Sequence, residues 1–424
     1  MTARIAYVSP LPPAGTGIAT YSRAVIDQLD EIGFAERHRV EPVWPVGPRA
    51  EETARRADLA VYHLGNNAQF HADIYRLAVR CPGLVVLHDL ALDDLTRWFV
   101  EQGDPLGDRT EAQAEGARER LILARPDLEG PLEVPWCAYA ARRARGVVVH
   151  SRFGREYLQA LGSRTPVFVI PHPIIDPPAA TRRAWRRARS IRESLVERVV
   201  IGVLGDLGAA KGIETILTAV GRLELPVHVA LVGRRISGYD VEEAVRRSGL
   251  DRVTVASDVS DRDFYAWLQA SDIVVNLRHP HRGEVSGTVV RAMAAGKPVV
   301  VPATGSYLDW PQEAVVRVTG GPPEPGALAR ALNPLVRDPD HRAAIGGRAA
   351  SHVGRLRRRR ATARGYRQAI EATLALVNDP ARRGAERWAR SLASVGATEQ
   401  DVPLAVRPVD ALHELARADA AGVT

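Results

Sequence analysis

The stretch Val274–Pro302, VVNLRHPHRGEVSGTVVRAMAAGKPVVVP, decides the fold expected of this chain. Its pattern predicts a strand, a loop, a helix and a second strand, at Ile273–Leu277, Arg278–Glu284, Thr288–Ala295 and Val299–Val301. Ser286 is a suitable N-cap for the helix, and Gly296 a suitable end. A strand that leads through a loop into a helix is the repeating unit of a parallel α/β sheet.

The start of the predicted helix has the properties of an anion site. The first turn of a helix carries unpaired backbone N–H groups and a partial positive charge. Gly287 lets a ligand approach the backbone closely. Charge-assisted hydrogen bonds can come from Arg278, Arg282 and Lys211. We therefore predict that a phosphate group binds here.

The composition is that of a water-soluble globular protein. The chain has 424 residues, of which 46% are hydrophobic and 25% charged, enough for two or three domains with cores of their own. No apolar run approaches the roughly 20 residues of a membrane helix, and no signal peptide is visible. Cys81 and Cys137 are too few for a disulfide framework. We expect a cytoplasmic location.

The basic residues are almost all arginine. The net charge is +7, and 55 of the 57 basic residues are Arg, so that Lys211 and Lys297 are the only lysines. We single out Lys211, because Lys297 can be explained by its place beside a helix end. The arginine-rich stretch 181–198 could bind nucleic acid or anionic lipid. We favour a solvated linker helix, because acidic residues follow; we expect no nucleic-acid partner, and peripheral membrane contact is the disfavoured alternative.

Two blocks of alternating strand and helix patterns predict two doubly wound domains. The predicted strands are Arg4–Val8, Ala57–Leu64, Leu84–Leu87, Gly146–His150 and Pro166–Ile170 in the first block, and Val199–Leu204, Val227–Val232, Val253–Val255 and Asp272–Leu277 in the second. A proline-rich segment between the blocks predicts a cleft. Ligands of such sheets bind outside the carboxyl ends of the strands, where Asn66, His88 and Asp89 lie. His88 could instead be a capping or core histidine.

The first strand is followed by a loop, Ser9–Gly17, that is rich in proline and glycine, and then by a helical pattern, Ile18–Ile32. This arrangement can cradle a phosphate through Gly15 and Gly17, or be a plain turn between strand and helix. It is neither a Walker loop nor a complete dinucleotide fingerprint.

The motifs resemble those of the retaining "group 1" glycosyltransferases of the GT-B fold. Ala292–Val300, AMAAGKPVV, matches the end of that family's donor motif, and Gly205–Gly212 resembles its diphosphate loop. Three positions depart from the family pattern. Arg291 stands where a second glutamate is usual, the first glutamate is Glu284 rather than residue 283, and Asp206 replaces an arginine.

The resemblance covers about residues 3–375 and implies two Rossmann-like domains that face each other across a cleft. We expect an acceptor domain at 1–175, a basic linker at 176–198, a donor domain at 199–350, a helix at 351–380 that crosses back, and an unassigned helical tail at 381–424. The implied activity is a retaining, metal-independent transfer from a nucleoside-diphosphate sugar to a small-molecule or glycan acceptor, without a cofactor.

The resemblance also implies roles for individual residues. We predict catalytic roles for His88, Lys211 and Glu284, and an acceptor-side position for Asn66 and Asp89. The predicted donor-binding residues are Gly15, Gly17, Gly205, Arg234, Arg278, Ser286, Gly287, Thr288 and Arg291. Two alternatives stay open: an inactive homologue that binds a sugar or a partner protein, and another GT-B enzyme such as an epimerase or a phosphorylase. The sequence does not indicate an oligomeric state.

Overall fold

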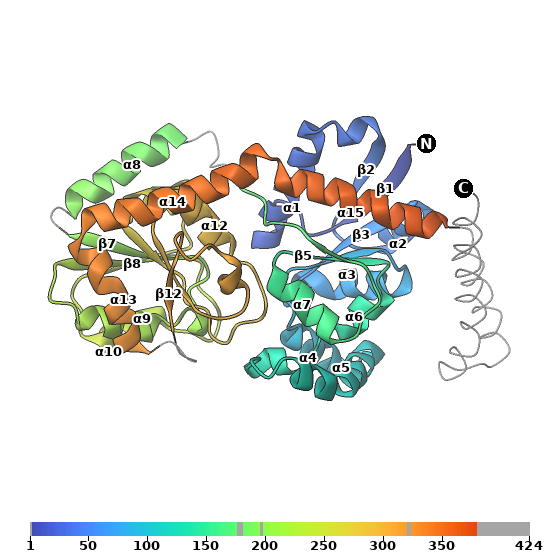
Figure 1. Ribbon diagram of the computed structural model, residues 1–424, viewed down its shortest axis with the longest axis horizontal. Coiled ribbons are helices and arrows are strands. Elements are labelled where there is room, and N and C mark those ends of the chain that lie inside the picture. Colours follow the sequence, from blue (N-terminus) through green and yellow to red (C-terminus); the bar gives the residue numbers. More distant parts are fainter. Residues whose placement is uncertain (1, 176–180, 196–197, 320–323, 380–424) are drawn as a thin grey trace, which may run out of the picture.

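The computed structural model describes residues 2–175, 181–195, 198–319 and 324–379. It contains two six-stranded sheets, in the orders β2-β1-β3-β4-β5-β6 and β12-β11-β10-β7-β8-β9. Every pair of neighbouring strands in them is parallel, for example β1 with β3 and β7 with β10. Helices cover both faces of each sheet (Figure 1). The predicted architecture of two doubly wound domains is therefore confirmed.

The first domain is built from residues of the N-terminal half. Its strands are β1 (Ala3–Val8), β2 (His38–Val43), β3 (Leu59–Leu64), β4 (Leu84–Leu87), β5 (Gly146–Val149) and β6 (Val167–Val169). Its helices are α1 (Gly17–Glu31), α2 (Pro48–Arg56), α3 (Ala68–Arg80), α4 (Asp93–Glu101), α5 (Pro105–Ala124), α6 (Ala138–Arg143) and α7 (Arg152–Ala160). The central strands are buried on both faces, which explains their continuous apolar runs.

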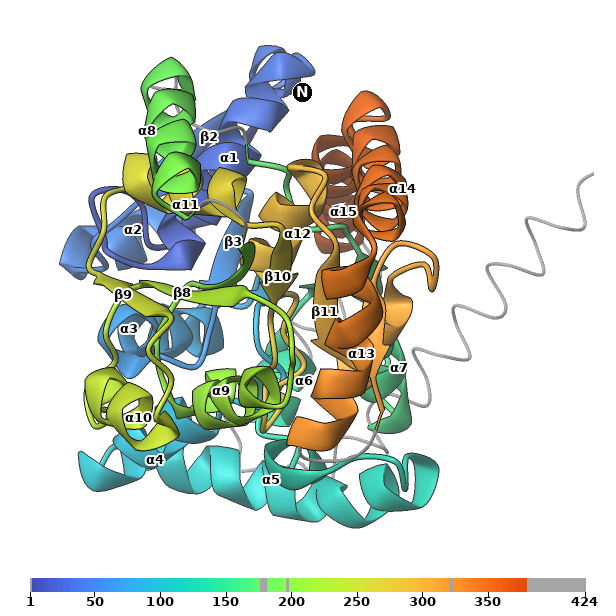
Figure 2. The same cartoon turned by 90° about the vertical axis from the view of Figure 1, so that its left-hand side faces the viewer.

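The second domain repeats the plan. Its strands are β7 (Val199–Leu204), β8 (Val227–Gly233), β9 (Val253–Ser257), β10 (Ile273–Val275), β11 (Val299–Pro302) and β12 (Val316–Val318). Its helices are α8 (Thr181–Ser194), α9 (Ile213–Gly221), α10 (Val241–Ser248), α11 (Asp261–Ala270), α12 (Gly287–Ala294), α13 (Pro325–Arg337) and α14 (Pro339–Arg358). Figure 2 shows α9, α10 and α13 on one face of this sheet and α8, α11, α12 and α14 on the other.

Helix α8 occupies most of the stretch that we predicted as a basic linker. Its apolar side, Ala184, Ala188 and Ile191, is buried, and the last two pack with Ala266 and Ala270 of α11. Arg183, Arg186, Arg187 and Arg189 are exposed on the outer side, where Arg189 and Glu193 form an ion pair of 3.0 Å. Arg192 instead turns toward the domain and pairs with Asp272 at 2.8 Å. The basic face is therefore the solvated side of an amphipathic helix, as the sequence suggested, and the helix packs on the second domain.

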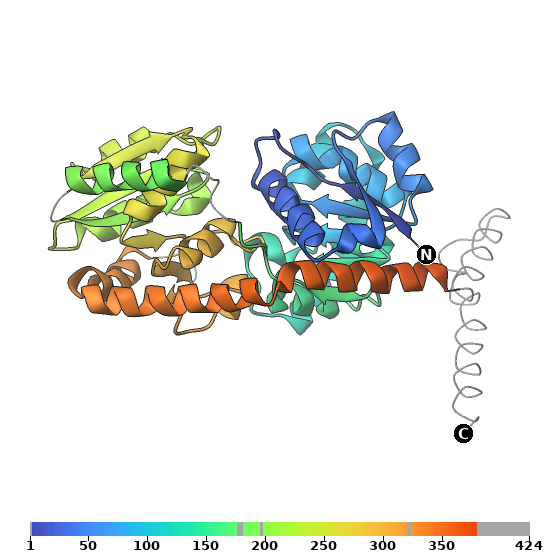
Figure 3. The ribbon, with the colours of Figure 1, turned by 90° about the horizontal axis from the view of Figure 1, so that it is seen from above.

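The last helix, α15 (Ala361–Asn378), crosses to the first domain (Figure 3). Its buried side chains Tyr366, Ala369 and Ile370 join the core that contains Tyr21 of α1 and Val61 of β3. The hydroxyl groups of Tyr21 and Tyr366 form a buried hydrogen bond of 2.7 Å. Residues 380–424, including the predicted tail, lie outside the described residues. Within the described part, no helix combines the length and apolar character needed to cross a bilayer.

Candidate active site

A cleft of about 790 Å³ lies between the two domains and is lined by both. Its lining includes all but one of the predicted site residues: Gly17, Asn66, His88, Asp89, Gly205, Lys211, Arg234, Arg278, Glu284, Ser286, Gly287, Thr288 and Arg291. The remaining one, Gly15, is connected to this group because its carbonyl oxygen accepts a hydrogen bond from Arg234. The structure thus brings together residues that are up to 276 positions apart, from Gly15 to Arg291.

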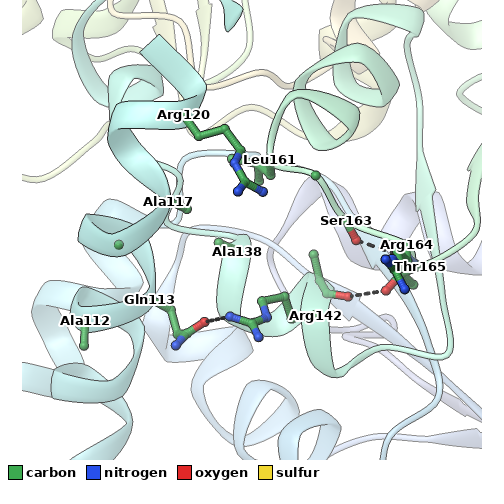
Figure 4. A pocket seen from close by; sticks show the side chains of 13 residues that line it. Ala112, Gln113, Ala117, Arg120, Ala138, Arg142, Leu161, Ser163, Arg164 and Thr165 are labelled. Carbon is green, nitrogen blue, oxygen red and sulfur yellow. Dashed lines mark hydrogen bonds between the residues drawn. The ribbon is translucent and has the colours of Figure 1, made fainter. Parts of the chain in front are cut away.

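A second cavity, of about 550 Å³, lies within the first domain, between α5, α6 and the loop after α7 (Figure 4). Arg120, Arg142 and Arg164 line it, and Arg142 donates a hydrogen bond to Gln113. None of the predicted site residues lines this cavity. The interdomain cleft is therefore the candidate active site.

Lys211 is buried at the bottom of the cleft, on the side that the second domain forms. Its ammonium group donates to the carbonyl oxygen of Leu204 at 2.8 Å and to Oδ1 of Asn276 at 2.7 Å. A lysine has three N–H groups, so one remains for a ligand. Burial, followed by repulsion from Arg278, lowers the pKa of Lys211 to about 7, although Asp206 and Glu284 act in the opposite direction.

Glycines bring the ends of β7 and β8 close to this ammonium group. Gly205 has φ +109°, and a Cβ there would lie 3.4 Å from Nζ of Lys211 and 3.2 Å from Oγ1 of Thr288. A Cβ at Gly233 would lie 1.8 Å from the carbonyl oxygen of Gly205, which no side chain permits. Glycine at both positions therefore lets the ends of β7 and β8 meet beside Lys211.

Asp206, which departs from the family pattern, is paired with a cation. Its carboxylate accepts two hydrogen bonds from Arg234, at 3.2 and 3.0 Å. Both side chains are about half exposed at the rim of the cleft, so the pair contributes little to stability. Arg234 nevertheless offsets the negative charge that Asp206 would place near a diphosphate.

The first turn of α12 opens into the cleft without a side-chain cap. Ser286 occupies the N-cap position, but its hydroxyl makes no capping hydrogen bond and instead lies 3.5 Å from Oδ1 of Asn276. A Cβ at Gly287 would lie 3.2 Å from Nε2 of His172, so this glycine leaves room between the helix and the first domain. The backbone N–H groups of this turn are available for an anion.

Glu284 is buried, with 7% of its surface exposed, and holds the loop before α12. Its Oε2 accepts the backbone N–H of Arg282 at 2.8 Å, and its Oε1 lies 3.3 Å from Nε of Arg278. Burial would raise the pKa of Glu284, but His281, Arg278 and the backbone hydrogen bond together lower it. Glu284 is therefore an ionised carboxylate that positions Arg278 at the cleft.

Arg291 lies on aromatic rings beside the cleft. Its guanidinium carbon is 5.6 Å from the ring centre of Phe264 and 5.8 Å from that of Tyr265. Stacking of this kind orients the planar group and preserves its positive charge. Arg291 offers donors where the family pattern has an acceptor, so it can contact phosphate or ring atoms of a ligand but cannot accept from a ribose hydroxyl.

Two acceptor-side residues have structural partners. The amide oxygen of Asn66 accepts from the backbone N–H groups of Asp94 and Leu95, at 3.0 and 3.2 Å, so Asn66 caps α4 from another segment. The backbone N–H of Asn66 donates to Asp89 at 3.0 Å. Burial and the neighbouring carboxylate of Glu284 raise the pKa of Asp89 to about 7. Asp89 is therefore harder to ionise than an exposed aspartate.

One tyrosine and two histidines that are absent from our predicted site residues surround His88. Tyr21 and His172 line the cleft with it, and the ring centre of Tyr21 lies 4.6 Å from that of His88 and 5.0 Å from that of His172. His63 forms a hydrogen bond with His88. The sequence does carry a signal for the two histidines, because His63 lies at the carboxyl end of the predicted strand Ala57–Leu64 and His172 follows the predicted strand Pro166–Ile170.

The loop before α12 also joins the two domains. The carbonyl oxygen of Arg282 accepts the backbone N–H groups of Leu90 and Ala91, at 2.8 and 3.1 Å. The guanidinium of Arg282 is 3.0 Å from Asp93 and 3.3 Å from Asp94. The loop before α12 therefore packs on the first domain next to Asp89.

Comparison with known proteins agrees with this geometry. Residues 198–338 match the model of the family described as "Glycosyl transferases group 1". This matched segment, which resembles the group 1 glycosyltransferases, makes up most of the second domain. The matched segment contains Lys211, Glu284 and the whole of α12. Among the described residues, no group of three or more histidine, cysteine or acidic side chains is placed to hold a metal ion.

One curated relative is a 2-deoxystreptamine glucosyltransferase from Streptomyces kanamyceticus, which is 26% identical over 223 residues. The match covers 50% of this chain and 56% of the relative, so it spans little more than half of that protein.

Solved structures show the same two-domain architecture over most of the chain. HepE from Anabaena, in complex with UDP and glucose, has a TM-score of 0.60 at 18% identity and covers 88% of this chain and 99% of its own. Sucrose-phosphate synthase from Thermosynechococcus elongatus has a TM-score of 0.60 at 18% identity, and covers 87% of this chain and 100% of its own. At this identity the likeness shows the two-domain GT-B fold alone.

Proposed function

We propose that the protein is a glycosyltransferase that moves a sugar from a nucleoside-diphosphate sugar to a small-molecule or glycan acceptor. The observation that supports this most is the convergence of the uncapped start of α12, the buried ammonium of Lys211 and the guanidinium of Arg278 on one cleft. These are three independent donors for a diphosphate. The family match of the same segment, and the glycosyl-transferring relatives, add support.

In the proposed reaction, the acceptor oxygen bonds to the anomeric carbon, and the bond from that carbon to the diphosphate breaks. The electron pair stays on the diphosphate oxygen, which also takes up the hydroxyl proton. Lys211, Arg278 and the N–H groups of α12 stabilise the charge that develops on the leaving group. Docking of the loop at Arg282 on the first domain excludes water and orients the acceptor.

We further propose retention of anomeric configuration and independence of divalent metals, as the resemblance implies, and a cytoplasmic location. A retained configuration would appear as an unchanged anomeric coupling in the proton NMR spectrum of the product. Turnover should be the same in EDTA as in magnesium. Loss of turnover in EDTA would contradict the metal-independent mechanism and leave the transferase assignment intact.

The decisive experiment has two steps. First, UDP, GDP, TDP and ADP are compared for their ability to raise the melting temperature, since a ligand that binds only the folded state stabilises it. Second, the sugar nucleotide with the stabilising base is incubated with candidate acceptors, and release of the nucleoside diphosphate is measured. Stabilisation by one nucleotide together with acceptor-dependent release supports the proposal. Stabilisation without release would favour the inactive homologue, and no stabilisation by any nucleotide would reject donor binding.

A further inference from the structure

We propose that His63 holds His88 in the tautomer that carries its proton on Nδ1, so that His88 presents a hydrogen-bond donor to the cleft and cannot act there as a general base. The inference rests on the proposed function, because a bound donor sugar or acceptor is what this N–H would contact. It makes His63 a positioning residue. The two histidines lie near the carboxyl ends of the neighbouring strands β3 and β4.

The two imidazole rings share a single hydrogen bond. Nδ1 of His63 is 3.0 Å from Nε2 of His88, so one of these nitrogens carries the proton and the other accepts it. The ring planes are inclined by 30°, with centres 5.3 Å apart, so the rings meet edge to edge as such a bond requires. The backbone N–H of His88 donates to the carbonyl oxygen of Leu64 at 2.9 Å, and the carbonyl oxygen of His63 is 3.1 Å from Nδ1 of His71. Both residues are therefore held on their strands.

The surroundings of His63 decide the direction of this hydrogen bond. The residue is fully buried, and its Nε2 has no hydrogen-bond partner. Around the ring lie Tyr7 and Tyr21, with ring centres 4.7 and 5.8 Å away. A buried N–H without an acceptor is rarer than a buried acceptor without a donor. The proton of a neutral His63 therefore lies on Nδ1 and is donated to His88.

Both rings are neutral. Burial, followed by repulsion from His150, lowers the pKa of His63 well below its ordinary value, and the same two causes lower the pKa of His88. The titratable groups that face His88 are Tyr21, His63, His71, His150 and His172, none of which is a carboxylate that could stabilise an imidazolium. In a charged His88 both ring nitrogens would carry protons, and the proton on Nε2 would face the proton that His63 carries on Nδ1.

The other nitrogen of His88 is the one left for a ligand. With Nε2 occupied by His63, the proton of a neutral His88 is on Nδ1. This atom has no partner among the described residues, and His88 lines the cleft. It can donate to a sugar hydroxyl or a phosphate oxygen, but it has no lone pair with which to take a proton from an acceptor hydroxyl. The hydroxyl proton must leave by another route.

The direct test is NMR spectroscopy of the full chain labelled with ring-¹⁵N histidine, without substrate. Long-range proton–nitrogen correlations show which ring nitrogen is protonated, and the spectrum of His88→Ala assigns the signals of His88. We expect a protonated Nδ1 and a bare Nε2 in both His63 and His88. A proton on Nε2 of His88 would overturn the inference. Because the measurement needs no turnover, its result stands apart from that of the proposed function.

A pair of variants tests the functional consequence. His63→Asn keeps an N–H near the position of Nδ1, whereas His63→Leu removes it. We expect His63→Leu to lower kcat by roughly tenfold or more, the size of effect known for partners that orient metal-bound histidines, with little change in the KM for the donor. His63→Asn should restore most of the activity. Equal losses in the two variants would show that His63 acts only through packing.

The control is His228→Leu, which removes a buried histidine of β8 that forms a hydrogen bond of 2.9 Å with Thr254 in the second domain. It should leave both kcat and the signals of His88 unchanged. If His63→Leu does not fold, as judged by circular dichroism, the tautomer of the unmodified protein decides the question.

Discussion

Among single residues, the two lysines of the chain allow a matched comparison. Each ammonium group donates to a backbone carbonyl oxygen, that of Lys211 to Leu204 at 2.8 Å and that of Lys297 to Gln269 at 2.7 Å. Only Lys211 lines the cleft. We expect Lys211→Met to weaken binding of the stabilising nucleoside diphosphate by about 1.5–3 kcal/mol, the value of a charged hydrogen bond, and Lys297→Met to leave it unchanged, as measured by calorimetry. If Lys211→Met bound the nucleoside diphosphate as tightly as the unmodified protein, Lys211 would not be part of the binding site.

The pKa of Lys211 predicts how binding of the nucleoside diphosphate depends on pH. The pKa of Lys211 is about 7 in the free protein, because burial and Arg278 lower it. A bound diphosphate is anionic and raises this pKa, so that binding at pH 8 takes up a proton and affinity falls as the pH rises above 7. Calorimetry in buffers of different ionisation enthalpy would detect the proton. Its persistence in Lys211→Met would assign the uptake to another group.

At the scale of elements, α4 depends on a cap from outside the helix. Its N-cap residue, Leu92, makes no side-chain hydrogen bond, and Asn66 accepts the first-turn N–H groups instead. Asn66→Ala should lower the free energy of unfolding by about 0.5–2 kcal/mol, the usual cost of losing a cap, as measured by urea denaturation. Asn333→Ala, which removes an exposed hydrogen bond with Arg337 on α13, should change it by less than about 0.5 kcal/mol. An unchanged stability in Asn66→Ala would mean that water replaces the cap.

The helices and strands also show which structural features could be predicted from the sequence. The helix expected at Thr288–Ala295 is α12, Gly287–Ala294, because its apolar spacing and its glycine end are local signals. The edge strands β2 and β12 were not predicted, since they lack the continuous apolar run of a central strand, and β2 contains Pro42. The cleft residues were predictable because strand ends share one edge of a sheet. The pairing of Asp206 with Arg234 and of His63 with His88 was not, because these contacts join distant segments.

For the whole molecule, a carboxylate of the second domain caps a helix of the first, at a contact apart from the cleft. The carboxylate of Asp309, in the second domain, accepts the backbone N–H groups of Arg152 and Phe153 at the start of α7. Asp309→Ala should let the two domains move farther apart, which small-angle scattering would show as a larger radius of gyration. Asp338 caps α14 within one domain, at 2.9 Å from two N–H groups, so Asp338→Ala should lose similar stability without a change in radius. Equal radii of gyration in both variants would show that the hydrogen bonds to Asp309 do not hold the two domains together.

Arg360, with φ +49°, is the joint between α14 and α15. Helix α14 packs on α12, whereas α15 packs on the first domain. The two helices therefore connect the domains, and the bend between them is at Arg360. Under the proposed function, a rotation of one domain against the other would turn these helices and move α12, whose first turn would hold the leaving diphosphate. Closure on the substrate and alignment of that turn would then be one movement, and a substitution at Arg360, which does not line the cleft, would impair both.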